Sequence, residues 1–153
     1  MKLRIVALGH RMPAWVDAGY ADYAQRLPRE YGLDLVALKP ASRGMPTARV
    51  LADERRRIEA ACAGYAIVAL DERGAAWTTR SLAARLSGWR DDGTDIAFVI
   101  GSADGLDPAL KSHAAARVQL SAMTLPHGLV RVLLVEQIYR AASLLAGHPY
   151  HRE

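Results

Sequence analysis

The end of the chain gathers side chains that could bind a nucleobase and move a proton. Residues 148–152 read His-Pro-Tyr-His-Arg, which brings together two imidazoles, one phenol ring and one guanidinium. Imidazole transfers protons near neutral pH, an aromatic ring can stack on a base, and a guanidinium pairs with phosphate. The position is also typical of an ordinary frayed terminus. Composition leaves both interpretations of this segment, the C-terminal tail, open.

A second candidate site is formed by three segments that each follow an apolar, strand-like run. They cover residues 70–74, 101–105 and 120–128. Ligands of open α/β sheets bind at the carboxyl ends of the strands, so these segments predict a pocket. Gly101 and Gly105 would allow the backbone to approach a ligand closely. The sequence Gly-Ser-Ala-Asp-Gly is neither the dinucleotide-binding fingerprint nor a phosphate-binding P-loop, so the ligand stays unnamed.

The residue pattern predicts no metal centre. The five histidines lack the spacing of a zinc motif, and the single Cys62 excludes both an intramolecular disulfide and a thiolate cluster. We interpret Cys62 as a small apolar residue on a helix, which suits a reducing cytoplasm. His127 follows Pro126 in the third segment, where a structural hydrogen bond and a catalytic role are both open.

The elements expected to position these segments alternate between strands and helices. Apolar, β-branched runs predict the strands, and caps, glycines and prolines delimit the helices. The expected strands are 3–9, 33–38, 65–70, 95–100 and 118–120, and the expected helices are 13–27, 47–63, 78–89, 107–116 and 129–146. This alternation predicts an α/β fold with a mainly parallel sheet, helices on both of its faces, and one domain spanning residues 1–153.

Two of the expected helices have informative surfaces. The first begins at Thr47, its expected N-cap, and carries mixed charge over residues 53–59, which is typical of a solvated face. The helix at 129–146 is apolar in nearly every direction, so one sheet cannot cover it. We therefore expect a second copy of the chain to cover its other side in a homodimer. Its charges exclude a membrane span.

The composition is that of an ordinary soluble globular protein. Of the 153 residues, 51% are hydrophobic and 24% are charged, and the formal net charge is +4. No charged leader with an apolar core begins the chain, so we expect a cytoplasmic protein. The modest positive charge permits a nucleic-acid partner without establishing one.

Several motifs, taken in chain order, carry a resemblance to a known family. They are Leu3 to Gly9 with Met12-Pro13-x-Trp15, Leu70-Asp71, Phe98-Val99-Ile100-Gly101, Leu120-Ser121-Ala122-Met123-Thr124-Leu125-Pro126-His127, Leu129-Val130-Arg131-Val132-Leu133, Glu136-Gln137-Ile138-Tyr139-Arg140-Ala141 and the C-terminal tail. In these motifs the whole chain resembles the RlmH family, the small bacterial SPOUT-class methyltransferases of large-subunit ribosomal RNA.

The resemblance implies a fold and an activity that periodicity could not have indicated. It implies a C-terminal trefoil knot that builds an S-adenosylmethionine site, which departs from the rule that chains are unknotted. It implies a homodimer. It also implies methyl transfer to N3 of a pseudouridine in the intersubunit-bridge hairpin of 23S ribosomal RNA, on assembled 70S ribosomes.

Matching the motifs residue by residue assigns roles within this chain. The implied cofactor-binding residues are Leu70, Gly101, Leu120, Ser121, Ala122, Met123, Thr124 and Leu125, and the implied catalytic and RNA-engaging residues are Tyr150, His151 and Arg152. We hypothesise that His151 or Tyr150 assists removal of the N3 proton while Arg152 holds phosphate or the anionic base. Arg131 and Arg140 are further candidates, although a helical arginine can simply pair with Glu136.

One departure from the family and three rival interpretations remain. The family usually has a second glycine where this chain has Ser102, and a glutamate where it has Asp104, so the geometry of this turn is in question. The rivals are a non-catalytic ribosome-associated factor, a SPOUT methyltransferase of tRNA, and a nucleotide-binding oxidoreductase. The last would need the missing glycine fingerprint.

Overall fold

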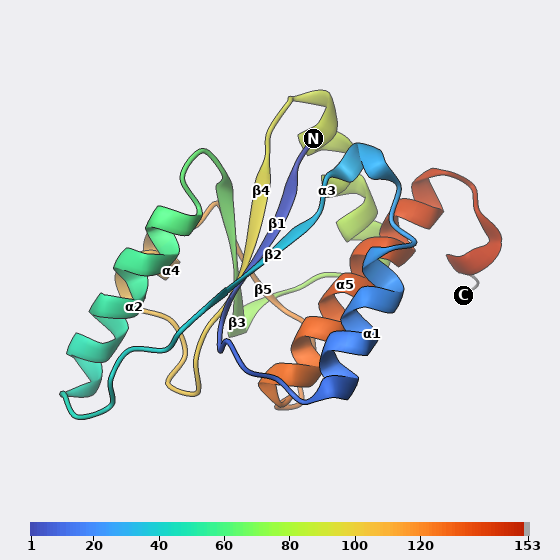
Figure 1. Ribbon diagram of the computed structural model, residues 1–153. Helices are drawn as coiled ribbons and strands as arrows, with labels where there is room; N and C mark the ends of the chain where they lie inside the picture. Colours follow the sequence, from blue (N-terminus) through green and yellow to red (C-terminus); the bar gives the residue numbers. More distant parts are fainter. Residues whose placement is uncertain (152–153) are drawn as a thin grey trace.

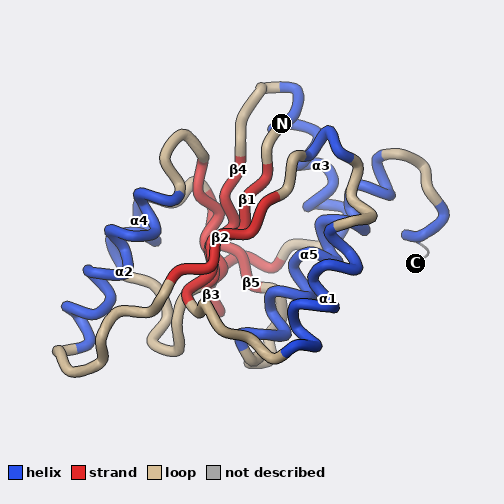
Figure 2. The backbone as a smooth tube through the Cα atoms, viewed as in Figure 1, coloured by secondary structure: helices blue, strands red, loops and turns tan. Residues whose placement is uncertain are grey.

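The structure, a computed structural model, centres on one five-stranded sheet (Figures 1 and 2). It describes residues 1–151, and of His151 it describes the backbone alone. The strands lie in the order β2-β1-β4-β3-β5, and every neighbouring pair is parallel. Their bounds are β1 Leu3–Leu8, β2 Asp34–Leu38, β3 Ala66–Ala76, β4 Ile96–Ile100 and β5 Ala116–Gln119. The prediction of a mainly parallel sheet is confirmed.

Helices cover both faces of this sheet, as predicted. Figure 1 shows α2 (Thr47–Ala61) and α4 (Pro108–His113) on one face. The other face carries α1 (Ala14–Ala24), α3 (Thr79–Asp91) and α5 (His127–Leu145). Short 3-10 turns occupy Arg29–Tyr31 (η1) and Pro149–His151 (η2). Each layer of helices encloses its own buried apolar cluster, and the fully buried strand β4 contributes to both.

Three local expectations were wrong, for different physical reasons. Thr47 is the first residue of α2 and not its cap, because Pro46 occupies the cap position, with no capping side chain. The strand expected to end at Leu70 continues as β3 to Ala76, with a register shift against β5 between Leu70 and Ala75. On α2, Glu54 is 2% exposed and does not belong to a solvated face.

The apolar surface of α5 is covered largely within the chain. Helix α5 packs against α1, α3 and η2 as well as against the sheet. Gly19 of α1 permits a close approach, because a Cβ there would lie 3.3 Å from the Val132 side chain. The burial of α5 therefore does not by itself require a second copy of the chain, and the homodimer stays a prediction. Trp15 on α1, 58% exposed, is a large apolar side chain left on this layer.

Candidate functional site

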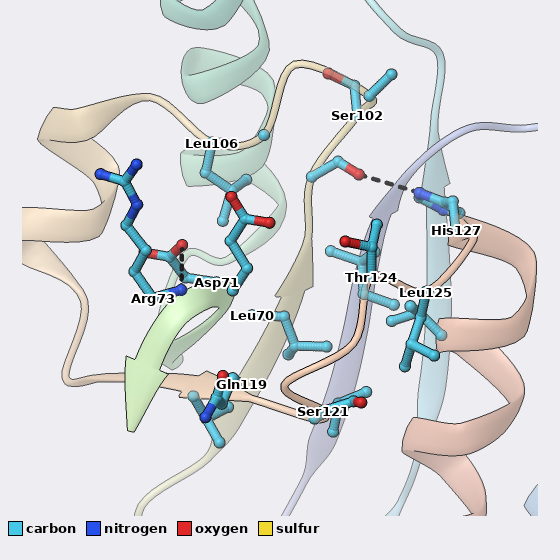
Figure 3. A pocket seen from close by; sticks show the side chains of 18 of the residues that line it. Leu70, Asp71, Arg73, Ser102, Leu106, Gln119, Ser121, Thr124, Leu125 and His127 are labelled. Atoms are coloured by element: carbon cyan, nitrogen blue, oxygen red, sulfur yellow. Dashed lines mark hydrogen bonds between the residues drawn. The ribbon is translucent and has the colours of Figure 1, made fainter. Parts of the chain in front are cut away.

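The three predicted segments meet around one cavity. It has a volume of about 640 Å³, which lies within the usual range for small-molecule sites. Its walls come from residues 70–73 of β3, 100–106 after β4 and part of 118–127 between β5 and α5 (Figure 3). Because the strands are parallel, their carboxyl ends lie at the same edge of the sheet and bring these segments together.

Most of the residues predicted to bind a cofactor line this cavity. They are Leu70, Gly101, Leu120, Ser121, Met123, Thr124 and Leu125. Ala122 is exposed and is not among the lining residues. The Ser121 hydroxyl oxygen accepts a hydrogen bond from the Met123 backbone N–H at 2.9 Å, which stabilises the turn in which Ala122 lies. Met123 is 79% exposed and places a flexible apolar side chain at the rim.

Gly101 is required by the packing of its own turn. A Cβ on Gly101 would lie 2.7 Å from the carbonyl oxygen of Gly105, and the Gly105 N–H donates to the Ser102 carbonyl at 2.9 Å. Gly105 has a φ of +81°, a conformation that favours glycine. The two glycines therefore make the turn narrow enough to form one wall of the cavity.

His127 joins this turn to the start of α5. Its Nδ1 lies 3.0 Å from the Gly101 carbonyl oxygen, and its Nε2 lies 3.2 Å from Nε of Arg131. A carbonyl only accepts and a guanidinium only donates, so the ring is neutral with its proton on Nδ1. Burial and the nearby Arg131 charge lower the pKa of His127. Both ring nitrogens are engaged, which favours the structural interpretation of this residue.

Arg131 is a buried member of the same network and not a surface residue. It is 2% exposed, and its guanidinium also donates to the carbonyl oxygen of Gly9. Burial lowers the pKa of Arg131. Arg131 therefore connects the end of β1 to the pocket through His127.

Asp71 lines the cavity with a carboxylate to which sequence analysis assigned no role. Its side chain is 8% exposed, and Oδ1 accepts from the Arg73 N–H at 3.2 Å. Oδ2 is buried and accepts no hydrogen bond within the described residues, while Nζ of Lys111 lies 3.5 Å away. Asp71 and Lys111 therefore form an ion pair in the wall of the cavity. The available signal was an acidic residue directly after an apolar strand.

The C-terminal tail docks on α5 away from this cavity. The Tyr150 hydroxyl donates to Oε1 of Glu136 at 3.1 Å, and its ring packs against Tyr139 in a tilted arrangement, with the centroids 4.6 Å apart. Burial and the bond to Glu136 raise the pKa of Tyr150 to about 12. Glu136 is nine residues beyond His127, or about 14 Å along the helix. Tyr150 does not line the cavity of its own chain.

The remaining candidate residues are Arg140, His151 and Arg152. Arg140 pairs with Glu136, its Nε donating to Oε1 at 2.8 Å, as the one-turn spacing indicated. The side chain of His151 and the whole of Arg152 lie outside the described residues. Among the side chains that the structure describes, no cluster of three or more His, Cys, Asp or Glu could hold a metal ion, and none of the described helices is long and apolar enough to cross a membrane.

A parallel α/β sheet whose cavity is closed by a strand–loop–helix segment is the architecture of a SPOUT methyltransferase. Residues 1–151 match the family described as "Predicted SPOUT methyltransferase", and the chain belongs to this family. Residues of the segment 120–127 line the same cavity as the turn at 101–106, and His127 bonds to Gly101, which is consistent with the trefoil knot that the resemblance implied.

Within the family, similar proteins share one name. The chain is 55% identical to the "Ribosomal RNA large subunit methyltransferase H" of Burkholderia vietnamiensis and 57% identical to that of Burkholderia thailandensis, over 99% of each chain in both cases. Identity at this level over the full length shows that the resemblance to this group of methyltransferases is correct.

Two solved structures share the fold at low identity. One is a probable methylase family protein from Haemophilus influenzae, with a TM-score of 0.62, 13% identity, and coverage of 99% of this chain and 70% of the other. The second is a putative methylase family protein from Neisseria gonorrhoeae, with a TM-score of 0.56, 14% identity, and coverage of 90% and 81%. At these low identities, the two similarities are evidence for the fold alone.

Proposed function

We propose that this single-domain protein methylates 23S ribosomal RNA in the cytoplasm, using S-adenosylmethionine. The target is N3 of a pseudouridine in the intersubunit-bridge hairpin, and the substrate is the assembled 70S ribosome. The observation that carries the proposal is the three-segment cavity, formed in a chain whose full-length relatives are named as methyltransferases of large-subunit ribosomal RNA.

The residues around the cavity fit a cofactor of this kind. Apolar side chains of Leu70, Leu120 and Leu125 suit an adenine ring, and the narrow turn at Gly101 offers backbone groups. The Asp71 carboxylate, paired with Lys111, also lines the cavity and suits a hydroxyl or ammonium donor. When bound, S-adenosylmethionine supplies an electrophilic methyl group.

The protein's own contribution to the reaction is positioning and proton removal. N3 of a uracil-type base carries a weakly acidic proton, whose loss precedes or accompanies attack on the methyl group. Holding the base in line with the methyl group provides much of the rate acceleration. Tyr150 already donates to Glu136 and has a pKa of about 12, so it is poorly suited to accept this proton. We therefore assign proton removal to His151, contact with phosphate or the anionic base to Arg152, and anchoring of the tail to Tyr150.

A homodimer would complete the site. Tyr150 anchors the tail about 14 Å along α5 from the residue that contacts Gly101. We propose that the tail of one protomer serves the cavity of its partner, with the ribosome supplying the remaining contacts to the RNA. A net charge of only +4 supports this division, because the protein alone offers limited attraction for RNA.

A comparison of substrates tests the proposal. Purified protein is incubated with methyl-labelled S-adenosylmethionine and unmodified 70S ribosomes, separated subunits or tRNA. We expect label in 23S RNA from 70S particles and little elsewhere. Label in tRNA would overturn the substrate, and binding of the cofactor without any transfer would favour a non-catalytic ribosome-associated factor.

A further inference from the structure

Glu54 is a buried carboxylate that lies behind the cavity wall. It belongs to α2, on the opposite face of the sheet from α5, and is 2% exposed. It does not line the cavity. A buried carboxylate is costly unless hydrogen bonds compensate for its lost hydration. The hydrogen-bond partners of Glu54 therefore indicate which part of the structure it stabilises.

Two donors from separate loops satisfy Glu54. The Ser102 hydroxyl donates to Oε1 at 2.8 Å, and the Ala41 backbone N–H donates to Oε2 at 3.1 Å. Ala41 is in the loop that follows β2, and Ser102 is in the turn that forms the cavity wall. Glu54 thus holds this turn against the body of the protein. The adjacent Arg55 lies 3.8 Å from Asp107, at the other end of the same connection.

Gly101, the residue before Ser102, is held by a contact from the opposite face of the sheet. His127 donates to the carbonyl oxygen of Gly101, as the dashed line in Figure 3 shows, while the side chain of Ser102 bonds to Glu54. One contact comes from α5 and the other from α2, on the two faces of the sheet. Two consecutive residues of the turn are therefore fixed from two directions, which limits how far the wall can move.

We propose that Glu54 is a positioning residue for the cofactor, acting through Ser102. The inference rests on the proposed function, because it assigns the cavity to S-adenosylmethionine. The Ser102 hydroxyl anchors the turn to α2 through its hydrogen bond to Glu54. Cofactor affinity then depends on a side chain that never touches the cofactor.

Binding of S-adenosylhomocysteine to the full-length protein, measured by calorimetry, tests this inference. We expect Glu54→Ala and Ser102→Ala each to weaken binding roughly tenfold, because each leaves a buried partner unsatisfied and frees the turn. The double variant should bind no more weakly than Glu54→Ala, since both changes break one connection. Glu54→Gln should bind within about twofold of wild type, because its amide can still bond to both Ala41 and Ser102.

A matched control and a second readout separate positioning from general stability. Glu59→Ala removes an exposed carboxylate from the same helix and should leave binding unchanged. Hydrogen exchange without ligand should show faster exchange at residues 101–106 in Glu54→Ala and not in Glu59→Ala. If Glu54→Ala does not fold, Ser102→Ala, a smaller change at a half-buried site, gives the same readouts.

The outcomes distinguish this inference from the proposed function. If wild-type protein fails to bind S-adenosylhomocysteine, the proposed cofactor is wrong. If wild type binds and Ser102→Ala binds equally well, Glu54 does not position the cofactor through Ser102. The inference would also be overturned if the loss of affinity in the double variant equalled the product of the losses in the two single variants.

Discussion

The Nδ1–H of His127 donates to the carbonyl oxygen of Gly101 at 3.0 Å, joining the first residue of α5 to the end of β4. The two residues are far apart in the sequence, and their bond holds the cavity wall in place. Arg131 occupies the other ring nitrogen, so the histidine acts as a bridge between a buried cation and a backbone turn. This arrangement leads to the first two predictions.

Replacing His127 by alanine should weaken binding of S-adenosylhomocysteine roughly tenfold, because the Gly101 carbonyl and Arg131 both lose a partner. His127→Asn should recover part of the loss, since its amide can donate to the carbonyl. Calorimetry measures both affinities. His113→Ala, at an exposed position on α4, is the control. Equal affinity of His127→Ala and wild type would show that the bridge does not shape the cavity.

Stability should fall as the solution is acidified, in a window set by His127. Its pKa in the folded protein lies below the ordinary value of about 6.5, so the unfolded chain binds the proton more tightly. The contribution of the neutral ring is complete above about pH 6.5 and is lost as the pH falls through the lower folded pKa. Thermal melts of wild type and His127→Asn should therefore converge on acidification. A constant difference across the window would contradict this.

Gly101→Ala should damage the site, whereas the same change at Gly88 should not. A Cβ at position 101 would lie 2.7 Å from the Gly105 carbonyl oxygen, while one at position 88 meets nothing within 4 Å. We expect Gly101→Ala to cost about 1–3 kcal/mol in the free energy of unfolding and to weaken ligand binding. Gly88→Ala, within α3, should stabilise by about 0.5–1 kcal/mol. Denaturant unfolding measures both, and equal effects would refute the packing argument.

Asp71→Ala should weaken ligand binding roughly tenfold, because it removes a carboxylate that lines the cavity and leaves Lys111 without its ion-pair partner. Glu30→Ala, which removes an exposed carboxylate on η1 away from the cavity, serves as the control. Calorimetry of S-adenosylhomocysteine binding to wild type and to both variants measures the effect. Retained affinity in Asp71→Ala would assign this carboxylate to its ion pair with Lys111 and not to the ligand.

Tyr150→Phe should separate cofactor binding from RNA methylation. The change keeps the ring against Tyr139 and removes the bond to Glu136, which should cost about 1 kcal/mol of tail anchoring. We expect unchanged binding of S-adenosylhomocysteine, since Tyr150 does not line the cavity of its own chain, together with slower transfer to 70S ribosomes. A large loss of cofactor affinity would contradict this separation.

The sequence was sufficient for features that depend on local pattern. Apolar runs located the five strands, and Thr78 and Asp107 behave as helix caps as their residue types predict. The cavity followed from three segments at strand ends. These features depend on periodicity and turn chemistry, which a single sequence displays.

Features that depend on distant pairing could not be predicted. Residues 71–76 look like a loop, yet they extend β3 because β5 provides a partner for Ala75 and Ala76. Glu54 sits in a run of charges typical of a solvated surface, and only its bonds to Ala41 and Ser102 explain its burial. The docking of Tyr150 on Glu136 likewise requires the tail to fold back, which no periodicity indicates.

Mass spectrometry of 23S RNA after methyl transfer identifies the atom that the protein modifies. Ribosomes lacking the modification are incubated as 70S particles with the purified protein and S-adenosylmethionine, and the RNA is digested to fragments and nucleosides. We expect one added methyl group, on N3 of a pseudouridine in the intersubunit-bridge hairpin. A methyl group on another nucleotide, or no transfer by protein that binds the cofactor, would contradict the proposed function.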